Sequence, residues 1–415
     1  MRRMFFFLFT GLILTTNPVD AQTYSILIKN GHVIDAKNKI NEVMDVAISD
    51  GKIAAIAKNI DPALATQIVD AKGMYVTPGL IDIHVHVFAG TDPDHAYSNG
   101  SSALAPDGYT FRAGVTTVVD CGGAGWKSFP KFKKNIIDRS QTRVLSFLNI
   151  VGEGMRGGEW EQDITDMDSK KSAETALANK DEIVGFKLAH FEAESWVPVE
   201  RAEEAGRLAN MPVIVDFGGS DSHAPLSIEK LFTQYFRPGD IYTHVYTELP
   251  RRDPVVDLKT RKLKSFVIPA QKRGIIFDVG FGGGSFNFNQ AVPAIKAGLL
   301  PNTMGTDLHT GSMNGAMKDQ LNVLSTFLAL GMNIPDVISR STWAPAQAIK
   351  REELGNLSIG AIADVAVLSI REGNFGFRDV AGNKKEGKQR FECEMTIKGG
   401  KIVYDLNAIA TTPVK

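Results

Sequence analysis

The sequence predicts an α/β fold: a (β/α)8 TIM barrel that carries a small β-sandwich domain built from both ends of the chain. Eight short apolar runs, separated by segments of helical periodicity, predict the barrel. Strand-like segments joined by turn signals in both flanks predict the second domain. Metal-compatible side chains follow several of the apolar runs, at the end of a barrel strand where the chemistry of this fold gathers.

The apolar runs cover 79–86, 114–120, 144–150, 183–187, 212–216, 241–244, 274–280 and 302–307. Strands of a parallel barrel are buried on both faces, so they are expected to be almost continuously apolar. The segment 198–210 is typical of the intervening helices. Its apolar residues recur near the helical spacing of three to four: Val199, Ala202, Ala205, Leu208 and Ala209.

The flanks have a different pattern. Segment 24–71 contains strand-like runs joined by Asn30-Gly31 and Asp50-Gly51, which are strong hairpin signals. Similar strands return at 363–368 and 395–404. Neither flank has enough strands to cover a hydrophobic face alone. We therefore expect 22–75 and 351–415 to form the two parts of one β-sandwich domain, around a barrel of residues 76–350.

The first 21 residues resemble a secretory signal peptide. Arg2 and Arg3 precede an apolar stretch over 4–14, and small residues at 19–21 offer a cleavage position before Gln22. A membrane anchor is the alternative, but the stretch is shorter than the ~20 residues that span a bilayer. We expect a periplasmic or secreted protein with no stable membrane association after cleavage.

Composition limits the partners and the redox chemistry. A net charge of -1 over 415 residues gives no global field for nucleic acid, so we expect a small-molecule substrate. Cys121 and Cys393 fall in different predicted domains, and we expect free thiols. The sequence leaves a homo-oligomer open.

His84 and His86 close the first barrel run. Residues at i and i+2 of a strand point to the same side, so the two imidazoles are expected to converge on one point, which suits a divalent metal. Two unrelated surface histidines are the alternative. Further candidates fall at the ends of later runs, and the set is His84, His86, Lys187, Asp216, His244 and Asp307.

Several segments together resemble the amidohydrolase superfamily: VTPGLIDIHVHVF, GVTTVVDCGGAG, GFKLAH, PGDIYTH and MGTDLHTGS. The nearest match is its amidohydrolase/deacetylase branch, related to dihydroorotases and D-aminoacylases. The resemblance implies a metal-dependent hydrolase of amide or ester bonds in small molecules such as N-acyl amino acids or acylated hydroxy acids. A cyclic-amide hydrolase of the dihydroorotase or hydantoinase kind is the alternative enzyme. A binding protein that has lost catalysis is the alternative outside enzymes.

The resemblance also implies a site of two divalent metal ions, usually zinc, under a bridging hydroxide. His84, His86 and Asp307 would hold the more buried ion, and His244 the second. Lys187 would bridge both as a carbamate formed with carbon dioxide, since a free ammonium cannot bind a cation. Asp307 would also be the catalytic acid and base.

The sequence departs from the resemblance at the fifth strand, where Asp216 stands in place of a histidine. Its carboxylate can bind zinc but adds negative charge, so we expect a less acidic bridging water and more tolerance of manganese. His223, in the following loop, is the alternative ligand. Relatives carry a histidine where this chain has Phe281, which would make the substrate pocket more apolar.

Three other residues are, together with His223, candidates for substrate binding. The glycines around Gly283 could let the backbone approach a ligand or only form a flexible turn. His190 and His309 lie close in sequence to Lys187 and Asp307, where they could contact the substrate, support the metal ligands or be structural.

Overall fold

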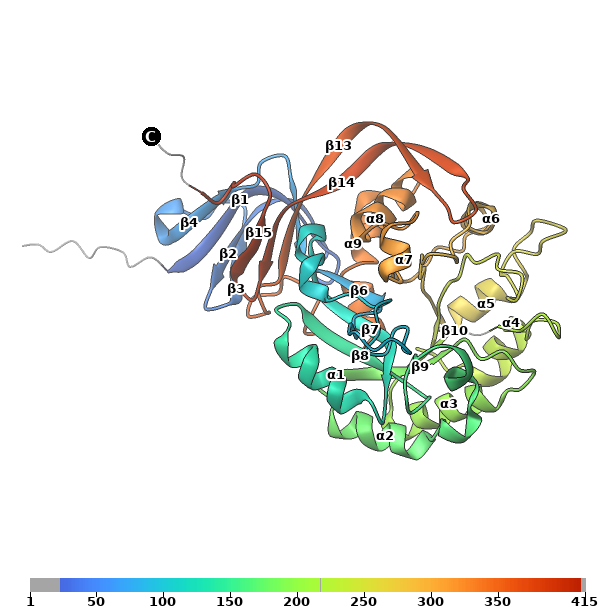
Figure 1. The fold of residues 1–415 in the computed structure, drawn as a ribbon. Coiled ribbons are helices and arrows are strands. Elements are labelled where there is room, and N and C mark those ends of the chain that lie inside the picture. Colours follow the sequence, from blue (N-terminus) through green and yellow to red (C-terminus); the bar gives the residue numbers. More distant parts are fainter. Residues whose placement is uncertain (1–22, 217, 412–415) are drawn as a thin grey trace, which may run out of the picture.

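The computed structural model describes residues 23–216 and 218–411, and it contains a barrel with a β domain at one side (Figure 1). The expected signal peptide, 1–21, lies outside the described residues. No helix within the described residues is long and apolar enough to cross a membrane.

The predicted barrel is confirmed. Seven parallel strands form one curled sheet in sequence order: β6 (Leu80–Val85), β7 (Val115–Gly125), β8 (Arg143–Asn149), β9 (Ile183–Ala189), β10 (Val213–Asp216), β11 (Ile241–Tyr242) and β12 (Ile276–Phe277). The eighth run is extended but irregular. It bridges both edges of the sheet, pairing Thr303 with Asp278 and Leu308 with Val85, and so closes the barrel.

The irregularity of the eighth run has a local cause. The Gly305 amide donates to the Asp278 carboxylate at 2.9 Å, and the Thr306 amide donates to Asp82 at 3.1 Å. Backbone donors that would enter a sheet ladder are therefore bound by buried side chains.

The helices that accompany the barrel are α1 (Phe129–Asn135), α2 (Ser169–Ala178), α3 (Val197–Ala209), α4 (Ile228–Lys230), α5 (Val267–Lys272), α6 (Phe288–Lys296), α7 (Thr310–Met313), α8 (Gln320–Ala329), α9 (Ile334–Ser339) and α10 (Trp343–Ala348). Figure 1 shows α1, α2 and α3 on the outside of the sheet. The helix predicted over 198–210 is confirmed as α3, which ends at Asn210 in the left-handed conformation. Its predicted apolar positions are buried except Leu208, which is 51% exposed.

Strands from both chain ends form one mixed sheet: β1 (Tyr24–Asp35), β2 (Ile40–Ser49), β3 (Lys52–Ala57), β4 (Ala65–Asp70), β5 (Tyr75–Pro78), β13 (Val365–Arg378), β14 (Lys384–Lys398) and β15 (Lys401–Asp405). Antiparallel pairing of β5 with β13 joins the two ends, as predicted. Val33, Val76, Val365 and Ile397 lie in a shared apolar core, so the two flanks bury their faces against each other.

One of the two predicted turns is wrong. Asp50-Gly51 joins β2 to β3 with positive φ at both residues, as a hairpin turn requires. Asn30-Gly31 is instead a bulge inside β1. The Asn30 amide donates to the Asp45 carboxylate at 2.9 Å, so the extra residue is satisfied without ending the strand.

The hairpin of β13 and β14 extends beyond the β domain and lies across α8 (Figure 1). The Phe391 amide donates to the Ser325 hydroxyl at 3.0 Å in the middle of the hairpin. At its tip, Asp379 accepts from the Phe288 amide at 3.0 Å and so caps the first turn of α6. The second half of the β domain thus also braces the barrel, which the sequence did not indicate.

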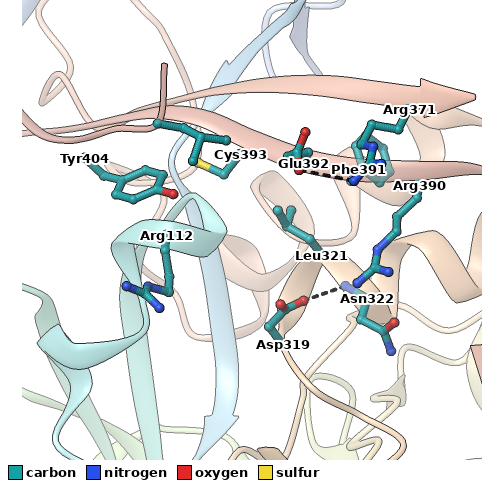
Figure 2. A pocket seen from close by; sticks show the side chains of 11 residues that line it. Arg112, Asp319, Leu321, Asn322, Arg371, Arg390, Phe391, Glu392, Cys393 and Tyr404 are labelled. Carbon is teal, nitrogen blue, oxygen red and sulfur yellow. Dashed lines mark hydrogen bonds and ion pairs between the residues drawn. The ribbon is translucent and has the colours of Figure 1, made fainter. Parts of the chain in front are cut away.

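A cavity of about 430 Å³ lies where this hairpin meets the barrel (Figure 2). Arg112, Arg371 and Arg390 line it together with Asp319 and Glu392. Cys393 also lines it, and Cys121 is buried in β7; both thiols are free, as predicted.

Candidate metal centre

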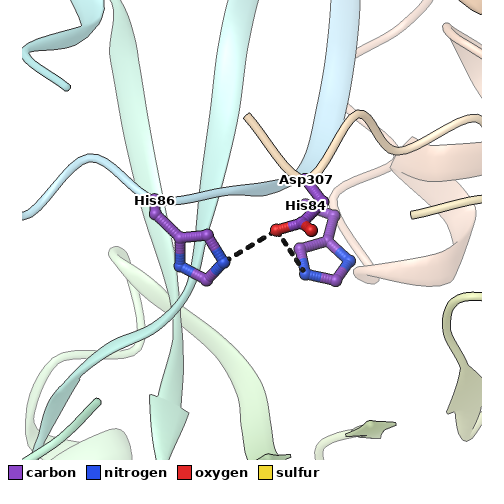
Figure 3. Close-up of side chains that lie close together, drawn as sticks. All are labelled: His84, His86 and Asp307. Carbon is purple, nitrogen blue, oxygen red and sulfur yellow. Dashed lines mark hydrogen bonds and ion pairs between the residues drawn. The ribbon is translucent and has the colours of Figure 1, made fainter. Parts of the chain in front are cut away.

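His84, His86 and Asp307 form a buried cluster in which one ligand atom of each lies within 4.8 Å of the others (Figure 3). The Asp307 Oδ1 atom lies 2.9 Å from His86 Nε2 and 3.6 Å from His84 Nε2. His84 lies in β6 and His86 directly follows its last residue, so the two-residue period of the extended chain places both imidazoles on one side. The donors are two nitrogens and a carboxylate, a set that suits zinc.

Buried partners orient His84. Its Nδ1 atom lies 2.8 Å from the Thr243 hydroxyl, which itself donates to Asp278 at 2.8 Å. The hydroxyl therefore accepts from Nδ1, which leaves Nε2 free to face Asp307. Burial lowers the pKa of His84 to about 4, with a further contribution from Lys187. The ring is neutral near pH 7, as a metal ligand must be.

Lys187 lies near the end of β9 and is 1% exposed. Its hydrogen-bond partner is the Cys121 thiol rather than a carboxylate. Burial opposes the charge, but Cys121, Asp216 and Asp307 hold the pKa of Lys187 above its ordinary value. Gly122 leaves room for this side chain, since a Cβ atom there would lie 2.6 Å from Lys187 Cγ.

Asp216 and His244 form a second cluster. Asp216 ends β10, and its Oδ2 atom lies 3.2 Å from His244 Nε2. The other ring nitrogen of His244 donates to the Gly280 carbonyl at 2.5 Å. Arg252 lies 2.9 Å from Asp216 Oδ1. Burial favours the neutral acid, but Arg252 and His244 hold the pKa of Asp216 well below its usual range.

One cavity of about 200 Å³ joins these groups. Its lining includes Asp216, His244, Asp307 and Arg252, with Tyr242, Thr243, Thr247, Leu249, Ser285 and His190. Side chains from β10, β11 and the eighth run therefore face a common space at the carboxyl ends of the strands, where TIM-barrel enzymes place their active sites.

His190 lies in this cavity, as expected for a residue near the substrate. Its Nδ1 atom lies 2.7 Å from the buried Glu161 carboxylate, and its Nε2 atom lies 3.5 Å from Asp216. Burial disfavours the charged ring, but the two carboxylates raise the pKa of His190 to about 10. The ring is therefore held as a cation between two acids.

His309 and Gly283 lie beside the metal cluster. The His309 ring centroid lies 6.2 Å from that of His86 and 5.4 Å from that of Tyr97. A Cβ atom on Gly283 would lie 3.5 Å from the His309 ring. His309 also caps α7, because its Nδ1 atom accepts from the Gly311 amide at 3.1 Å.

His223 lies away from the second cluster. Its ring nitrogens contact the carbonyls of Ala224 and Glu192 at 2.7 and 2.6 Å. Asp216, the other candidate, is the residue beside His244. The geometry therefore favours Asp216 over His223 as the fifth-strand ligand.

The sequence suggested that Phe281 would make the substrate cavity more apolar. In the structure Phe281 does not do so. It is fully buried and stacks on Phe286 with ring centroids 4.2 Å apart. Gly280 has a φ of 44°, so the chain turns here and carries the next side chain into the core. Gly282 does approach the site, since a Cβ atom there would lie 2.4 Å from Asp307 Oδ2.

Sequence reasoning missed Arg252, Thr243 and Asp278. Thr243 directly precedes a predicted ligand, and Asp278 falls inside a predicted barrel run, so their positions held a signal. Arg252 lies in the connection after β11, where no periodicity marks it.

Comparisons with known proteins identify relatives in sequence and in fold. No protein-family model matches the chain. A deacetylase from Brucella anthropi is 31% identical over 363 residues, which cover 85% of this chain and 86% of that protein. A crystal structure of an adenine deaminase superposes with a TM-score of 0.82 at 27% identity, over 92% of this chain and 100% of the other. A dihydroorotase structure gives a TM-score of 0.77 at 28% identity, over 92% and 99%.

Proposed function

Because the chain belongs to the amidohydrolase superfamily, alongside the bacterial deacetylases, we propose that it deacylates small acylated acids at a centre of two metal ions. It is a metal-dependent hydrolase of carbon–nitrogen bonds other than peptide bonds. The substrates that we propose are N-acyl amino acids or acylated hydroxy acids. The buried cluster of His84, His86 and Asp307 is the observation that carries the proposal.

We propose that these three residues hold one ion and that His244 and Asp216 hold the second. Zinc suits the nitrogen and carboxylate donors, and manganese is a second choice where carboxylates contribute more. Lys187 fits a bridging role as a carbamate, because it is buried near both clusters and a thiol, not an acid, is its hydrogen-bond partner. When bound, the ions would make hydroxide available near neutral pH and polarise the scissile carbonyl.

The protein's own residues would carry the proton and position the substrate. Asp307 would take a proton from the attacking water and return it to the leaving nitrogen or oxygen. Burial opposes ionisation of this carboxyl, but His86 and His84 hold the pKa of Asp307 below its usual value. It is therefore ionised and ready to accept a proton.

Metal analysis and a substrate panel test the proposal together. We expect about two ions per chain after purification with zinc and bicarbonate, and turnover of some N-acetyl-D- or L-amino acids or O-acetyl hydroxy acids. Lys187→Ala should hold fewer ions and lose activity. Turnover of only dihydroorotate or hydantoins would favour the cyclic-amide alternative, with which the dihydroorotase neighbour is compatible. One ion or none, without turnover, would favour a binding protein.

We also propose export. Arg2, Arg3 and the apolar stretch over 4–14 support a cleaved signal peptide, which would place the enzyme in the periplasm or outside the cell. Cell fractionation and N-terminal sequencing of the mature protein test this. We expect the mature chain to begin at Gln22, and an intact Met1 on a cytoplasmic protein would contradict it.

A further inference from the structure

Arg252 lines the cavity beside the candidate metal cluster and has a hydrogen-bond donor without a partner among the described residues. Its side chain is 14% exposed, and Nη2 lies 2.9 Å from Asp216 Oδ1. Its Nη1 atom is buried and has no hydrogen-bond partner among the described residues. A guanidinium nitrogen buried without an acceptor is costly, so this atom is suited to an acceptor that a ligand brings.

Arg252 also lies between two cavities. It lines the inner cavity of about 200 Å³ at the metal cluster and an outer cavity of about 480 Å³. His190 and Leu249 line both as well, so the two spaces adjoin. Phe191 and Pro250 give the outer cavity an apolar wall.

The second arginine of the outer cavity is already paired. Arg251 contacts Asp221 through Nε at 3.0 Å and Nη2 at 2.6 Å, and Glu192 through Nη1 at 3.6 Å. It is 48% exposed. Of the two arginines, Arg252 is therefore the one with a hydrogen-bond donor that has no partner among the described residues.

The packing around Arg252 holds the guanidinium in place. A Cβ atom on Gly218 would lie 2.7 Å from Arg252 Cδ and 2.8 Å from its Nε, so the loop after β10 leaves room for this side chain. Asp216 fixes one end of the group, and Nη1 at the other end is left without a partner. The contact between Nη2 and Asp216 is enough to neutralise that carboxylate. It does not explain why Nη1 is buried and unpaired.

We infer that Arg252 selects substrates with a carboxylate next to the scissile acyl group, which Nη1 binds while an apolar substituent enters the outer cavity. This inference rests on the proposed deacylation. In an acylated α-amino or α-hydroxy acid, one carbon joins the carboxylate, the acylated atom and the substituent. A single substrate can therefore place its carbonyl in the inner cavity, its carboxylate at Arg252 and its side chain against Phe191 and Pro250.

The test compares each N-acetyl amino acid that has an apolar side chain with its neutral carboxamide. We expect wild type to prefer the acid in kcat/KM by about 10- to 100-fold, the size of one charge-assisted hydrogen bond. Arg252→Gln should abolish most of this preference, mainly through KM of the acid, and Arg252→Lys should keep part of it. Because Arg252 also contacts Asp216, only the ratio between the two substrates is diagnostic. Arg261→Gln removes another arginine of the same connection, paired with Glu248 at 3.0 Å, and should not change the ratio.

Calorimetric binding of the same acids separates this inference from the proposed reaction. If the acids bind in a way that depends on Arg252 but are not turned over, the inference is supported and the proposed deacylation is ruled out. An equal loss of kcat/KM for the acid and for the carboxamide in Arg252→Gln would overturn the inference, because the residue would then act only through Asp216. A preference that disappears in Arg251→Gln instead, or wild-type preference for the carboxamide, would overturn it too.

Discussion

The two halves of the metal centre differ in how their charge is balanced. In the first half, Asp307 contacts two imidazoles, one of which burial keeps neutral. In the second half, Asp216 contacts His244 and also Arg252, a permanent cation. In the proposed centre a metal ion would balance the carboxylate of the first cluster, whereas the second cluster carries part of that balance within the protein.

This difference means that Asp216 and Arg252 act as one unit in the charge balance of the site. A carboxylate in place of histidine adds one negative charge, and the paired guanidinium cancels it. The sequence alone predicted a less acidic bridging water from Asp216. Asp216 and Arg252 together carry the same net charge as a neutral histidine. The reason to expect a less acidic bridging water is therefore weaker.

The largest expected effect is in the first half. We predict that Asp307→Asn lowers kcat by at least about 10³-fold, because it removes both a metal ligand and the proton acceptor. Asp278→Asn is the matched control, since Asp278 lies 3.5 Å behind His84 and is not a proposed ligand. It also accepts hydrogen bonds from Thr243, Thr303 and Gly305, so its loss should cost about 10- to 100-fold. Steady-state kinetics with a thermal melt checks both. A near-normal rate in Asp307→Asn, or equal losses in the two variants, would remove Asp307 from the acid–base role.

A smaller effect is expected in the second half. Asp216→His leaves Arg252 unpaired beside the second ion, and we predict about a tenfold loss of affinity for that ion by charge repulsion. Adding Arg252→Gln to the same chain should restore it. Zinc and manganese titrations of the two variants measure this. Unchanged metal affinity and metal preference in both would show that the two residues are not coupled.

The sequence predicted the strand ends well because they depend on local rules. The two-residue period of the chain at the end of β6 and the apolar run before Asp307 place the three candidate ligands without any knowledge of their neighbours. The irregular eighth strand could not be predicted, because the buried carboxylates of Asp82 and Asp278 that bind its amides come from distant parts of the chain.

The errors share a cause, which is tertiary context. Asn30 has a positive φ of 62°, which both a hairpin turn and a bulge can use, and the contact with Asp45 decides between them. Phe281 follows a turn whose direction the sequence does not reveal. Arg252 becomes significant only through the position of Asp216, on another strand end.

The smallest effect concerns Lys187, the proposed bridge between the two halves. Gly122 has a φ of 88°, and a Cβ atom there would meet Lys187 Cγ at 2.6 Å and Cβ at 2.9 Å. We predict that Gly122→Ala destabilises the fold by about 1–3 kcal/mol and lowers activity several-fold, because the lysine must shift. Gly73→Ala is the matched control: its φ is 80°, but no atom lies within 4 Å of the added Cβ, so it reports the backbone strain alone. The melting temperature and metal content of the two variants separate the cost of backbone strain from the cost of the contact with Lys187. If both lose equal stability and both keep full metal content, the contact with Lys187 has no role in holding the centre together.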